Sequence, residues 1–322
     1  MSAPDSPTTA DDKPARRWRD ALAVYLQPRV LVVLFLGFSS GLPLGLPGST
    51  LLVWMREAGV DLKTIGLFAL VGTPYTIKFF WAPLVDALHV PILTRLLGRR
   101  RAWLIFSQLL LMVAILLLAL SDPSRPLGVA LAALFVAAAS ATQDIVVDAF
   151  RVEALPENEQ AAGMASYVAA YRVGMLLSTA GALFLVSGFE ATGLARNAAW
   201  MWGYIAMAAL VVIGMLTALF ATEPETSRAA QASTERAFGR IVRAASGAFT
   251  EFAHYKDAWA ILAFVVLFKF TDAFSGTMTA PFVIDLGFTR NDYAAIVKGL
   301  GLGATLLGGF AGADRLHQTT HG

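Results

Sequence analysis

Charged side chains inside long apolar stretches are the residues of this sequence that could do chemistry. Lys78, Asp144 and Arg172 each interrupt such a stretch, and counted at about 1.5 Å per residue from one end they lie roughly 9–15 Å deep. An ionised group at the centre of a bilayer costs at least about 2.5–3.5 kcal/mol, so it usually faces protein or water and has a function. A cation there can bind an anionic substrate, and a carboxylate beside a cation can load and release a proton. We assign Lys78 and Arg172 to substrate binding and Asp144 to proton coupling.

A second charged pair lies near the middle of a later apolar stretch. Lys269 and Asp272 are three residues apart, which places them on one face of a helix. We add Lys269 to the substrate-binding group and Asp272 to the proton-coupling group. Tyr75, Tyr171 and Gln143 flank these charges and can donate hydrogen bonds to a sugar or a peptide. The alternatives remain open: the charges are ion pairs that hold helices in register, and the polar residues are packing contacts.

Another group of charges lies at one end of the apolar stretches, where water is near. It consists of Asp86, Arg99, Arg100, Arg101, Asp148, Arg151 and Glu153. Salt bridges at this level can form a gating latch, which closes in one conformation of a transporter and opens in another. An ordinary cluster of positive charge at the cytoplasmic end of a membrane protein is the alternative interpretation.

The elements that must position these residues are eight apolar stretches. They cover residues 30–54, 65–85, 102–120, 127–150, 163–186, 198–221, 258–284 and 293–312. Each has roughly the 20 residues that an α-helix needs to cross about 30 Å of hydrocarbon. Because every backbone amide must be paired inside lipid, we expect helices rather than strands. The sequence therefore predicts an all-α integral membrane protein, surrounded by a lipid bilayer.

Composition agrees with a membrane protein and narrows the chemistry. Hydrophobic residues make up 57% of the chain and charged residues 15%, and the mean hydropathy is +0.62. The absence of cysteine excludes disulfides, thiol catalysis and thiolate metal sites. The four histidines are scattered, so we expect no metal and no cofactor. We also expect no nucleic-acid partner.

The distribution of positive charge predicts the topology. Most of the 25 Lys and Arg residues fall in the termini and in alternate loops, which indicates that both termini are cytoplasmic. Residues 1–27 read as a disordered cytoplasmic tail, and residues 28–221 as a half with six spans. Residues 222–257 form a cytoplasmic linker, in which the spacing of basic and apolar residues predicts an amphipathic helix on the membrane or an ordinary solvated helix. Residues 258–322 hold the first two spans of a second half.

A faint internal repeat relates the two halves. A shift of 228 residues places Glu57 on Asp285 and Gly59 on Gly287, and both copies lie where a stretch enters a short polar turn. Parallel repeats of this kind are typical of transporters built from two similar halves.

Several motifs resemble one transporter family. Asp86 followed by residues 98–101 resembles the loop signature of the major facilitator superfamily, a fold of helical bundles. More specific are residues 36–44, 61–66, 78–86, 98–101, 143–149 and 171–175, which resemble AmpG-type muropeptide permeases in the same order. The similarity runs from about residue 31 to about residue 309. It implies a transporter, not an enzyme, which imports anhydro-muropeptides with protons across the bacterial inner (cytoplasmic) membrane during cell-wall recycling.

One departure from the family opens alternatives. A complete member would have twelve spans, whereas eight stretches are present here and residues 313–322 do not resemble a family loop. We therefore expect a truncated second half, completed by self-association or by a second polypeptide. The alternatives are a non-transporting sensor or assembly partner and an intramembrane transferase. A transferase usually has a cluster of catalytic residues at one interface, whereas His89 and His254 each stand alone.

Overall fold

The computed structural model describes residues 23–224, 258–301 and 304, and every regular element in these residues is a helix. The predicted all-α class is therefore confirmed. Five helical stretches are long and apolar enough to cross a membrane in the described part: Pro28–Glu57, Arg99–Ala119, Pro126–Ala154, Glu157–Ala191 and Arg196–Phe220. They coincide with the first and the third to sixth apolar stretches of the sequence.

The first spanning stretch contains a kink. Helix α2 (Pro28–Gly41) is followed by a 3-10 turn (Leu42–Gly45), a π-helical turn (Leu46–Thr50) and helix α3 (Leu51–Glu57). Pro43 and Pro47 have no N–H group, so the regular hydrogen-bond ladder cannot run through them. Ser40 lies next to the last residue of α2, directly before the kink, and is buried.

The second apolar stretch forms a broken helix. It is divided into α4 (Leu62–Leu67), a 3-10 turn (Phe68–Gly72), α5 (Thr73–Ile77), a second 3-10 turn (Lys78–Phe80) and α6 (Ala82–Ala87). The expectation of one regular helix over residues 65–85 was wrong in this detail. Pro74 and Pro83 lie in the first turns of α5 and α6, where a missing N–H is tolerated but the preceding helix ends.

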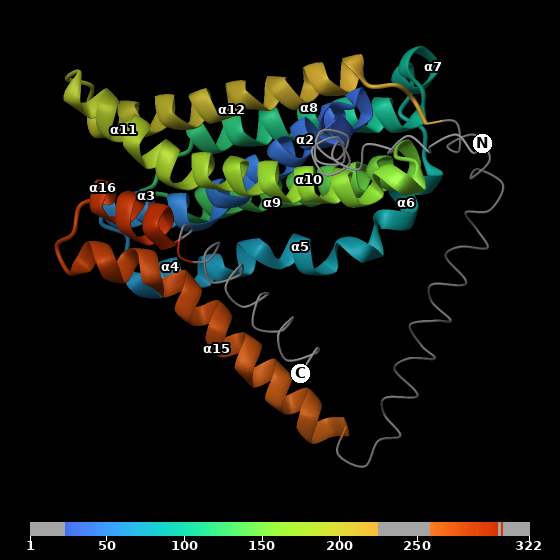
Figure 1. The fold of residues 1–322 in the computed structure, drawn as a ribbon. Helices are drawn as coiled ribbons and strands as arrows, with labels where there is room; N and C mark the ends of the chain where they lie inside the picture. Colours follow the sequence, from blue (N-terminus) through green and yellow to red (C-terminus); the bar gives the residue numbers. More distant parts are fainter. Residues whose placement is uncertain (1–22, 225–257, 302–303, 305–322) are drawn as a thin grey trace, which may run out of the picture.

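Longer helices complete the first part of the chain. They are α8 (Arg99–Ala119), α9 (Pro126–Ala154), α10 (Gln160–Leu176), α11 (Ala182–Ala191) and α12 (Arg196–Phe220). Three short elements adjoin them: α7 (Leu93–Leu97) before α8, a 3-10 turn (Glu157–Glu159) before α10, and a π-helical turn (Leu177–Gly181) between α10 and α11. Helix α2 packs against α10, α9 and α12, and α8 packs against α9 and α12 (Figure 1). The result is a bundle with α2 inside it.

Glycines allow α2 and α10 to approach each other closely. A Cβ on Gly41 would lie 2.0 Å from the carbonyl oxygen of Tyr171, and a Cβ on Gly37 would lie 2.5 Å from that of Tyr167. From the other helix, a Cβ on Gly174 would lie 2.3 Å from the carbonyl oxygen of Phe38. Small residues are the usual means of such contacts in membranes. The contact holds two tyrosines of α10 against the end of α2.

We expect Gly41→Val to destabilise this contact strongly. Inserting atoms into a packed interior usually costs about 1–3 kcal/mol, and the obstacle here is rigid backbone. The measurement is the melting temperature of the detergent-purified protein. Gly128→Val is the matched control, because a Cβ on Gly128 meets nothing within 4 Å. Equal melting temperatures for both variants would contradict the described packing.

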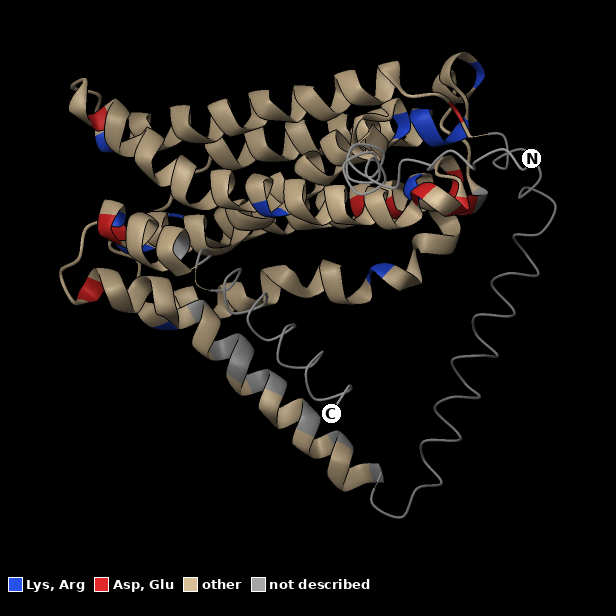
Figure 2. Cartoon of the chain, viewed as in Figure 1, with Lys and Arg blue, Asp and Glu red and all other residues tan. Residues whose placement is uncertain are grey.

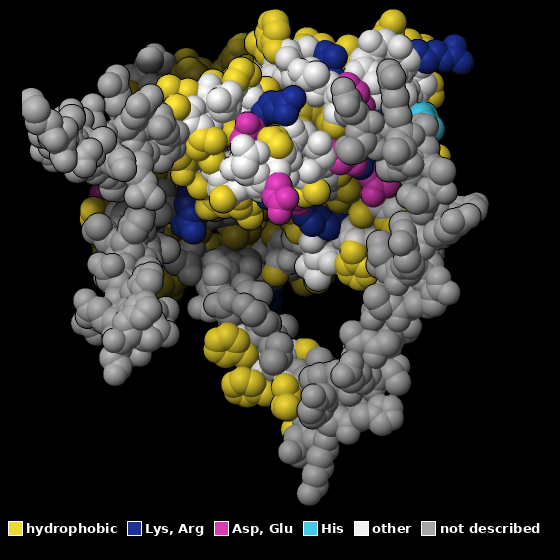
Figure 3. Space-filling model, turned by 45° about the vertical axis from the view of Figure 1, so that its right-hand side comes forward, with side chains coloured by type: hydrophobic (Ala, Val, Ile, Leu, Met, Phe, Trp, Pro, Cys, Tyr) yellow, Lys and Arg dark blue, Asp and Glu magenta, His cyan; other side chains and the backbone are white. Residues whose placement is uncertain are grey.

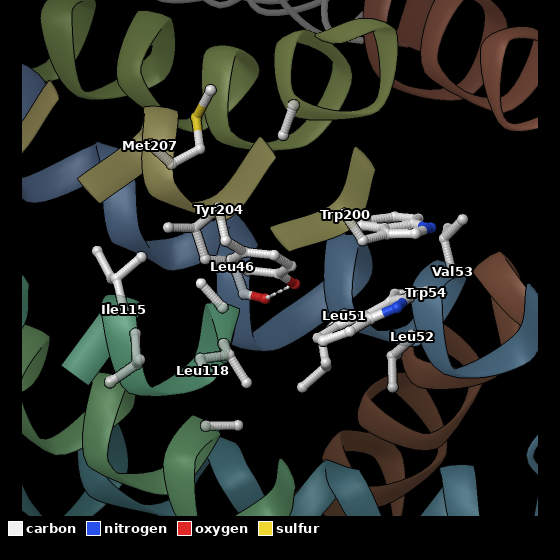
Figure 4. Packing of buried hydrophobic residues seen from close by; sticks show 14 of the residues in the cluster. Leu46, Leu51, Leu52, Val53, Trp54, Ile115, Leu118, Trp200, Tyr204 and Met207 are labelled. Atoms are coloured by element: carbon white, nitrogen blue, oxygen red, sulfur yellow. Dashed lines mark hydrogen bonds between the residues drawn. The ribbon is translucent and has the colours of Figure 1, made fainter. Parts of the chain in front are cut away.

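Aromatic residues fill the interior beyond the kink. The rings of Trp54 and Trp200 stack with centroids 5.8 Å apart, and Tyr204 packs 5.5 Å from Trp54 (Figure 4). The buried hydroxyl of Tyr204 donates a hydrogen bond of 3.1 Å to the carbonyl oxygen of Leu46. This bond supplies a partner to a backbone group in the kinked segment, where the helical ladder is irregular. It also fixes α12 against the first span.

The second part of the chain begins with α15 (Ala258–Asp285), followed by α16 (Arg290–Asp292) and a π-helical segment (Tyr293–Leu300). The carboxyl end of α15 packs on α3 and α4, where Ala280 is buried, whereas its amino end points away from the bundle (Figure 1). Trp259 and Phe264 there are about two-thirds exposed, and the projecting part shows hydrophobic side chains on its surface (Figure 3). The apolar surface agrees with a helix surrounded by lipid or by another helix.

Two equivalent turns support the internal repeat. A glycine with positive φ follows the end of each helix: Gly59 (82°) follows α3, and Gly287 (91°) follows α15. Two residues after each glycine, a side chain caps the next helix. Asp61 accepts a hydrogen bond from the backbone N–H of Thr64, and Thr289 accepts one from the backbone N–H of Asp292. Both correspondences obey the shift of 228 residues. Most of the tail, most of the linker with its predicted amphipathic helix, and residues 302–303 and 305–322 lie outside the described residues, so the division into four parts remains a proposal.

Candidate functional site

Asp144 on α9 is the centre of a polar site inside the bundle. Its Oδ2 atom lies 3.6 Å from the Nζ atom of Lys78, and its Oδ1 atom accepts a hydrogen bond from the hydroxyl of Ser40. The same hydroxyl lies 3.1 Å from the phenolic oxygen of Tyr167 on α10. The carboxylate therefore has a cation on one oxygen and a pair of linked hydroxyls on the other.

The irregular segments explain how these side chains meet. Lys78 starts the 3-10 turn between α5 and α6, and Trp81 anchors that turn by donating a hydrogen bond of 3.2 Å to Thr142 of α9. Ser40 and Tyr167 come together because the glycine contact brings α2 and α10 into close proximity. Breaks in spanning helices are a common feature of transporter binding sites.

The structure places the other expected site residues at different positions. Tyr171 is half-buried, and its ring stacks on that of Tyr167 with centroids 6.1 Å apart. Tyr75 lines a cavity of about 250 Å³ between the first and second spans. Gln143 is fully buried and donates a hydrogen bond of 3.3 Å to Ser39, so it faces α2 rather than this cavity.

Arg172 does not join the site as expected. It is half-buried and forms no ion pair with any carboxylate of the described residues, so the structure brings together two of the three charges of similar depth. The side chains of Lys269 and Asp272 lie outside the described residues, and their assignment remains a prediction. Ser40 and Tyr167 belong to the site but were not expected from the sequence.

Charged residues gather at the two ends of the bundle (Figure 2). At the end that holds residues 99–101, which we call the arginine-rich end, Arg100 is buried and occupies the centre. Its NH1 atom lies 2.6 Å from Asp86 Oδ1, and its Nε atom donates a 2.9 Å hydrogen bond to Glu153. Arg99, also buried, donates to the carbonyl oxygen of Asp86. Four of the expected latch residues are thus in direct contact.

Glu223 completes the arginine-rich end and was not expected. Its carboxylate accepts hydrogen bonds from the backbone N–H groups of Arg100 (2.8 Å) and Arg101 (3.0 Å), at the first turn of α8. Negative charge is favourable at a helix N-terminus. Gly98 allows this approach, because its φ is 91° and a Cβ would lie 2.5 Å from the carboxyl carbon of Glu223.

The remaining latch candidates have other neighbours. Arg101 donates a 3.0 Å hydrogen bond to the carbonyl oxygen of Ala218, at the end of α12. Arg151 lies 3.5 Å from Asp148, one helical turn away, and its guanidinium lies 5.6 Å from the ring centroid of Tyr167. The Asp148–Arg151 pair therefore adjoins the Asp144 site.

A second cluster, which we call the clasp, joins the two parts of the chain at the opposite end. Arg290 is buried between Glu57 (2.9 Å) and Glu190 (2.7 Å), and its guanidinium lies 5.5 Å from the ring of Trp200. Arg56 pairs with Asp285 beside them. The only hint of the clasp in the sequence is that Glu57 and Asp285 occupy equivalent positions of the repeat.

Within the described residues, no group of three or more His, Asp or Glu side chains could hold a metal ion. The polar contacts of the Asp144 site are an ion pair with Lys78 and the linked hydroxyls of Ser40 and Tyr167. Such contacts are suited to binding and moving charged species.

Comparison with known proteins identifies relatives over most of the chain. Residues 33–319 match the family model of the Major Facilitator Superfamily. The chain is 39% identical to the anhydromuropeptide permease of Escherichia coli (strain K12) over 293 residues, which are 90% of this chain and 56% of that protein. It is 35% identical to the putative transporter AmpG 4 of Rickettsia felis over 92% of this chain and 69% of that protein. The chain thus spans little more than half the length of the Escherichia coli relative.

Proposed function

The chain belongs to the AmpG-type permeases of the major facilitator superfamily, and we propose that it imports anhydromuropeptides together with protons across the bacterial inner membrane. The observation that carries the proposal is the Lys78–Asp144 pair inside the bundle. The substrate class comes from the Escherichia coli relative, which is called an anhydromuropeptide permease. Muropeptides carry carboxylates, which the partly buried Lys78 can bind.

Competition for Lys78 supplies a mechanism of coupling. When Asp144 is ionised, it attracts the ammonium group of Lys78. A proton on Asp144 removes that attraction and leaves Lys78 to a carboxylate of the substrate, because an unpaired cation in this setting is costly. Release of the proton restores the pair and displaces the substrate. Proton and substrate therefore move in the same direction.

The two charged ends correspond to the two gates. We assign the arginine-rich end to the cytoplasm, because positive residues remain on that side of the membrane. The clasp then lies at the periplasmic end, where it joins α3 and α11 to α15 and α16. In the described structure both ends hold ion pairs: Arg100 pairs with Asp86 and Glu153 at the arginine-rich end, and Arg290 pairs with Glu57 and Glu190 at the clasp.

Uptake by bacterial cells that lack their own muropeptide permease tests this function. Cells that express the 322-residue chain are incubated with radiolabelled anhydromuropeptide, and insertion of the chain is checked by immunoblot of membranes. We expect accumulation above the vector control, which collapses when an uncoupler removes the proton gradient. An inserted chain that accumulates no label would overturn the proposal.

The two acidic partners of Arg100, Asp86 and Glu153, should differ in how strongly their removal affects transport. We expect Asp86→Ala to lower the maximal uptake rate with little change in KM, because Arg100 keeps both hydrogen bonds to Glu153. Glu153→Ala should have a larger effect and also lower the amount of inserted protein. Loss of one partner of a buried ion pair typically costs about 3–5 kcal/mol. Kinetics of uptake measure the rates, and immunoblots measure the amount of inserted protein. Glu157→Ala is the control, because Glu157 is exposed. Unchanged rates in both variants would exclude a latch.

A further inference from the structure

Asp144 is connected to a second helix through hydroxyl groups alone. Ser40, which is 1% exposed, donates to Asp144 Oδ1 and lies 3.1 Å from the phenolic oxygen of Tyr167. Because Ser40 is buried, its hydroxyl has access to little besides these two oxygens. A proton that leaves Asp144 on this side therefore reaches Tyr167 next. Tyr167 itself is half-buried, so part of its side chain lies at the surface of the described bundle.

We propose that Ser40 and Tyr167 form a proton relay that connects Asp144 with the cytoplasmic side. This inference rests on the proposed function and assigns roles to two residues that the coupling mechanism does not otherwise use. Both hydroxyls can donate one hydrogen and accept others, as a relay requires. The relay gives the proton a path that is separate from Lys78, which lies at the other carboxylate oxygen.

The transfer balances without any further reactant. Protonated Asp144 passes its proton to the Ser40 oxygen, Ser40 passes its own hydroxyl proton to the Tyr167 oxygen, and Tyr167 passes its phenolic proton to water. Each hydroxyl ends with one proton, and Asp144 ends as a carboxylate. An ionised carboxylate only accepts hydrogen bonds, so the Ser40 hydrogen then points at Asp144 and Tyr167 donates to Ser40. The bond from Ser40 to Asp144 in the structure is that final arrangement.

The surroundings of Tyr167 give the relay its direction. The guanidinium of Arg151 lies 5.6 Å from the ring centroid and can stabilise negative charge that develops on the phenol during transfer. Arg151 and its partner Asp148 follow Asp144 on α9, which places them roughly 6–10 Å closer to the arginine-rich end at about 1.5 Å per residue. The relay thus leads away from the clasp.

The other groups around Asp144 do not offer an equivalent path. Its charged and titratable neighbours are Lys78 and Tyr75 from the second span, Tyr167 and Tyr171 from α10, and Asp148 from its own helix. The Ser40 hydroxyl donates a hydrogen bond to Oδ1 of this carboxylate, whereas Lys78 lies at Oδ2. Tyr171 contributes its ring, which stacks on Tyr167, and has no hydrogen bond to Ser40 in the structure.

Net transport and exchange distinguish a relay from a purely structural pair of hydroxyls. Accumulation driven by a proton gradient requires Asp144 to release its proton in every cycle. Exchange of labelled for unlabelled anhydromuropeptide across vesicle membranes needs no net proton movement. We expect Ser40→Ala and Tyr167→Phe each to lower accumulation by about 10²-fold, the lower end of what a positioned proton-transfer group contributes, and to leave exchange within about twofold of wild type. Ser40→Thr keeps the hydroxyl and should restore accumulation.

The control variant is Ser107→Ala, because its buried hydroxyl bonds only to a carbonyl of its own helix. Equal losses of accumulation and exchange in Ser40→Ala and Tyr167→Phe would mean a structural role and overturn the relay. Unimpaired accumulation in both variants would overturn it as well. Absence of uptake by the wild-type chain would instead refute the proposed function, so the two failures can be told apart.

Discussion

Asp144→Asn is expected to abolish proton-driven accumulation of anhydromuropeptide. Asparagine has nearly the same shape and can still accept the hydrogen bond from Ser40, but it can neither carry a proton nor pair with Lys78. Without a titrating group, release of the substrate is no longer linked to release of a proton. We expect accumulation at the level of the vector control, whereas membrane insertion is retained. The measurements are uptake of label and an immunoblot of the membrane fraction.

The matched control for this variant is Asp122→Asn. Asp122 is exposed in a loop, where its carboxylate accepts a hydrogen bond from the backbone N–H of Ser124 and lies 3.9 Å from Arg125. It has the same chemistry and no contact with the site, so its uptake should equal that of wild type. Wild-type accumulation by Asp144→Asn would remove Asp144 from the coupling mechanism.

Fixing the clasp is expected to stop transport almost completely. Ser187 of α11 donates a hydrogen bond of 2.7 Å to the side-chain oxygen of Asn291 in α16, beside the buried Arg290. Since the chain contains no cysteine, Ser187→Cys with Asn291→Cys introduces a unique pair of thiols. A short bifunctional methanethiosulfonate reagent should join them and hold the two parts of the chain together at this end. The substrate then cannot reach the site from the periplasm.

The reversal of the cross-link is the decisive part of that experiment. A thiol reductant cleaves the cross-link and should return uptake to the level of the untreated double variant. Each single variant, treated in the same way, serves as the control for modification without cross-linking. Full uptake by completely cross-linked protein would show that the clasp does not open during transport.

The sequence predicts the depth of a side chain better than its direction. Lys78, Asp144 and Arg172 lie at similar depths because a helix rises by a fixed distance per residue, and that is enough to group them. Which way each one faces depends on the packing of helices against one another. The structure accordingly pairs Lys78 with Asp144 and leaves Arg172 apart from the described carboxylates.

Uncharged site residues could not be predicted in the same way. Serines and tyrosines occur throughout the apolar stretches, so nothing about Ser40 or Tyr167 alone indicates a contact with Asp144. The contact depends on the close approach of α2 and α10 at Gly37 and Gly41. The spacing of these glycines indicates that some helix comes close, and only the fold shows that it is α10.

The helices, too, can be predicted only in part from the sequence. Hydropathy locates the apolar stretches because spanning length is a property of the sequence alone. It does not show that residues 65–85 break into short helices, although Pro74 and Pro83 mark the places. At the clasp, Arg290 is near its partners only after the second part of the chain has folded onto the first.

Proton movement that accompanies the substrate tests the central claim most directly. Anhydromuropeptide is added to a weakly buffered suspension of energy-depleted cells that lack their own permease and express the chain, and the external pH is recorded. We predict that the medium becomes more alkaline as the substrate enters, and that cells with Asp144→Asn show no such change. Entry of labelled substrate without any alkalinisation, or equal alkalinisation by Asp144→Asn, would contradict coupling through this carboxylate.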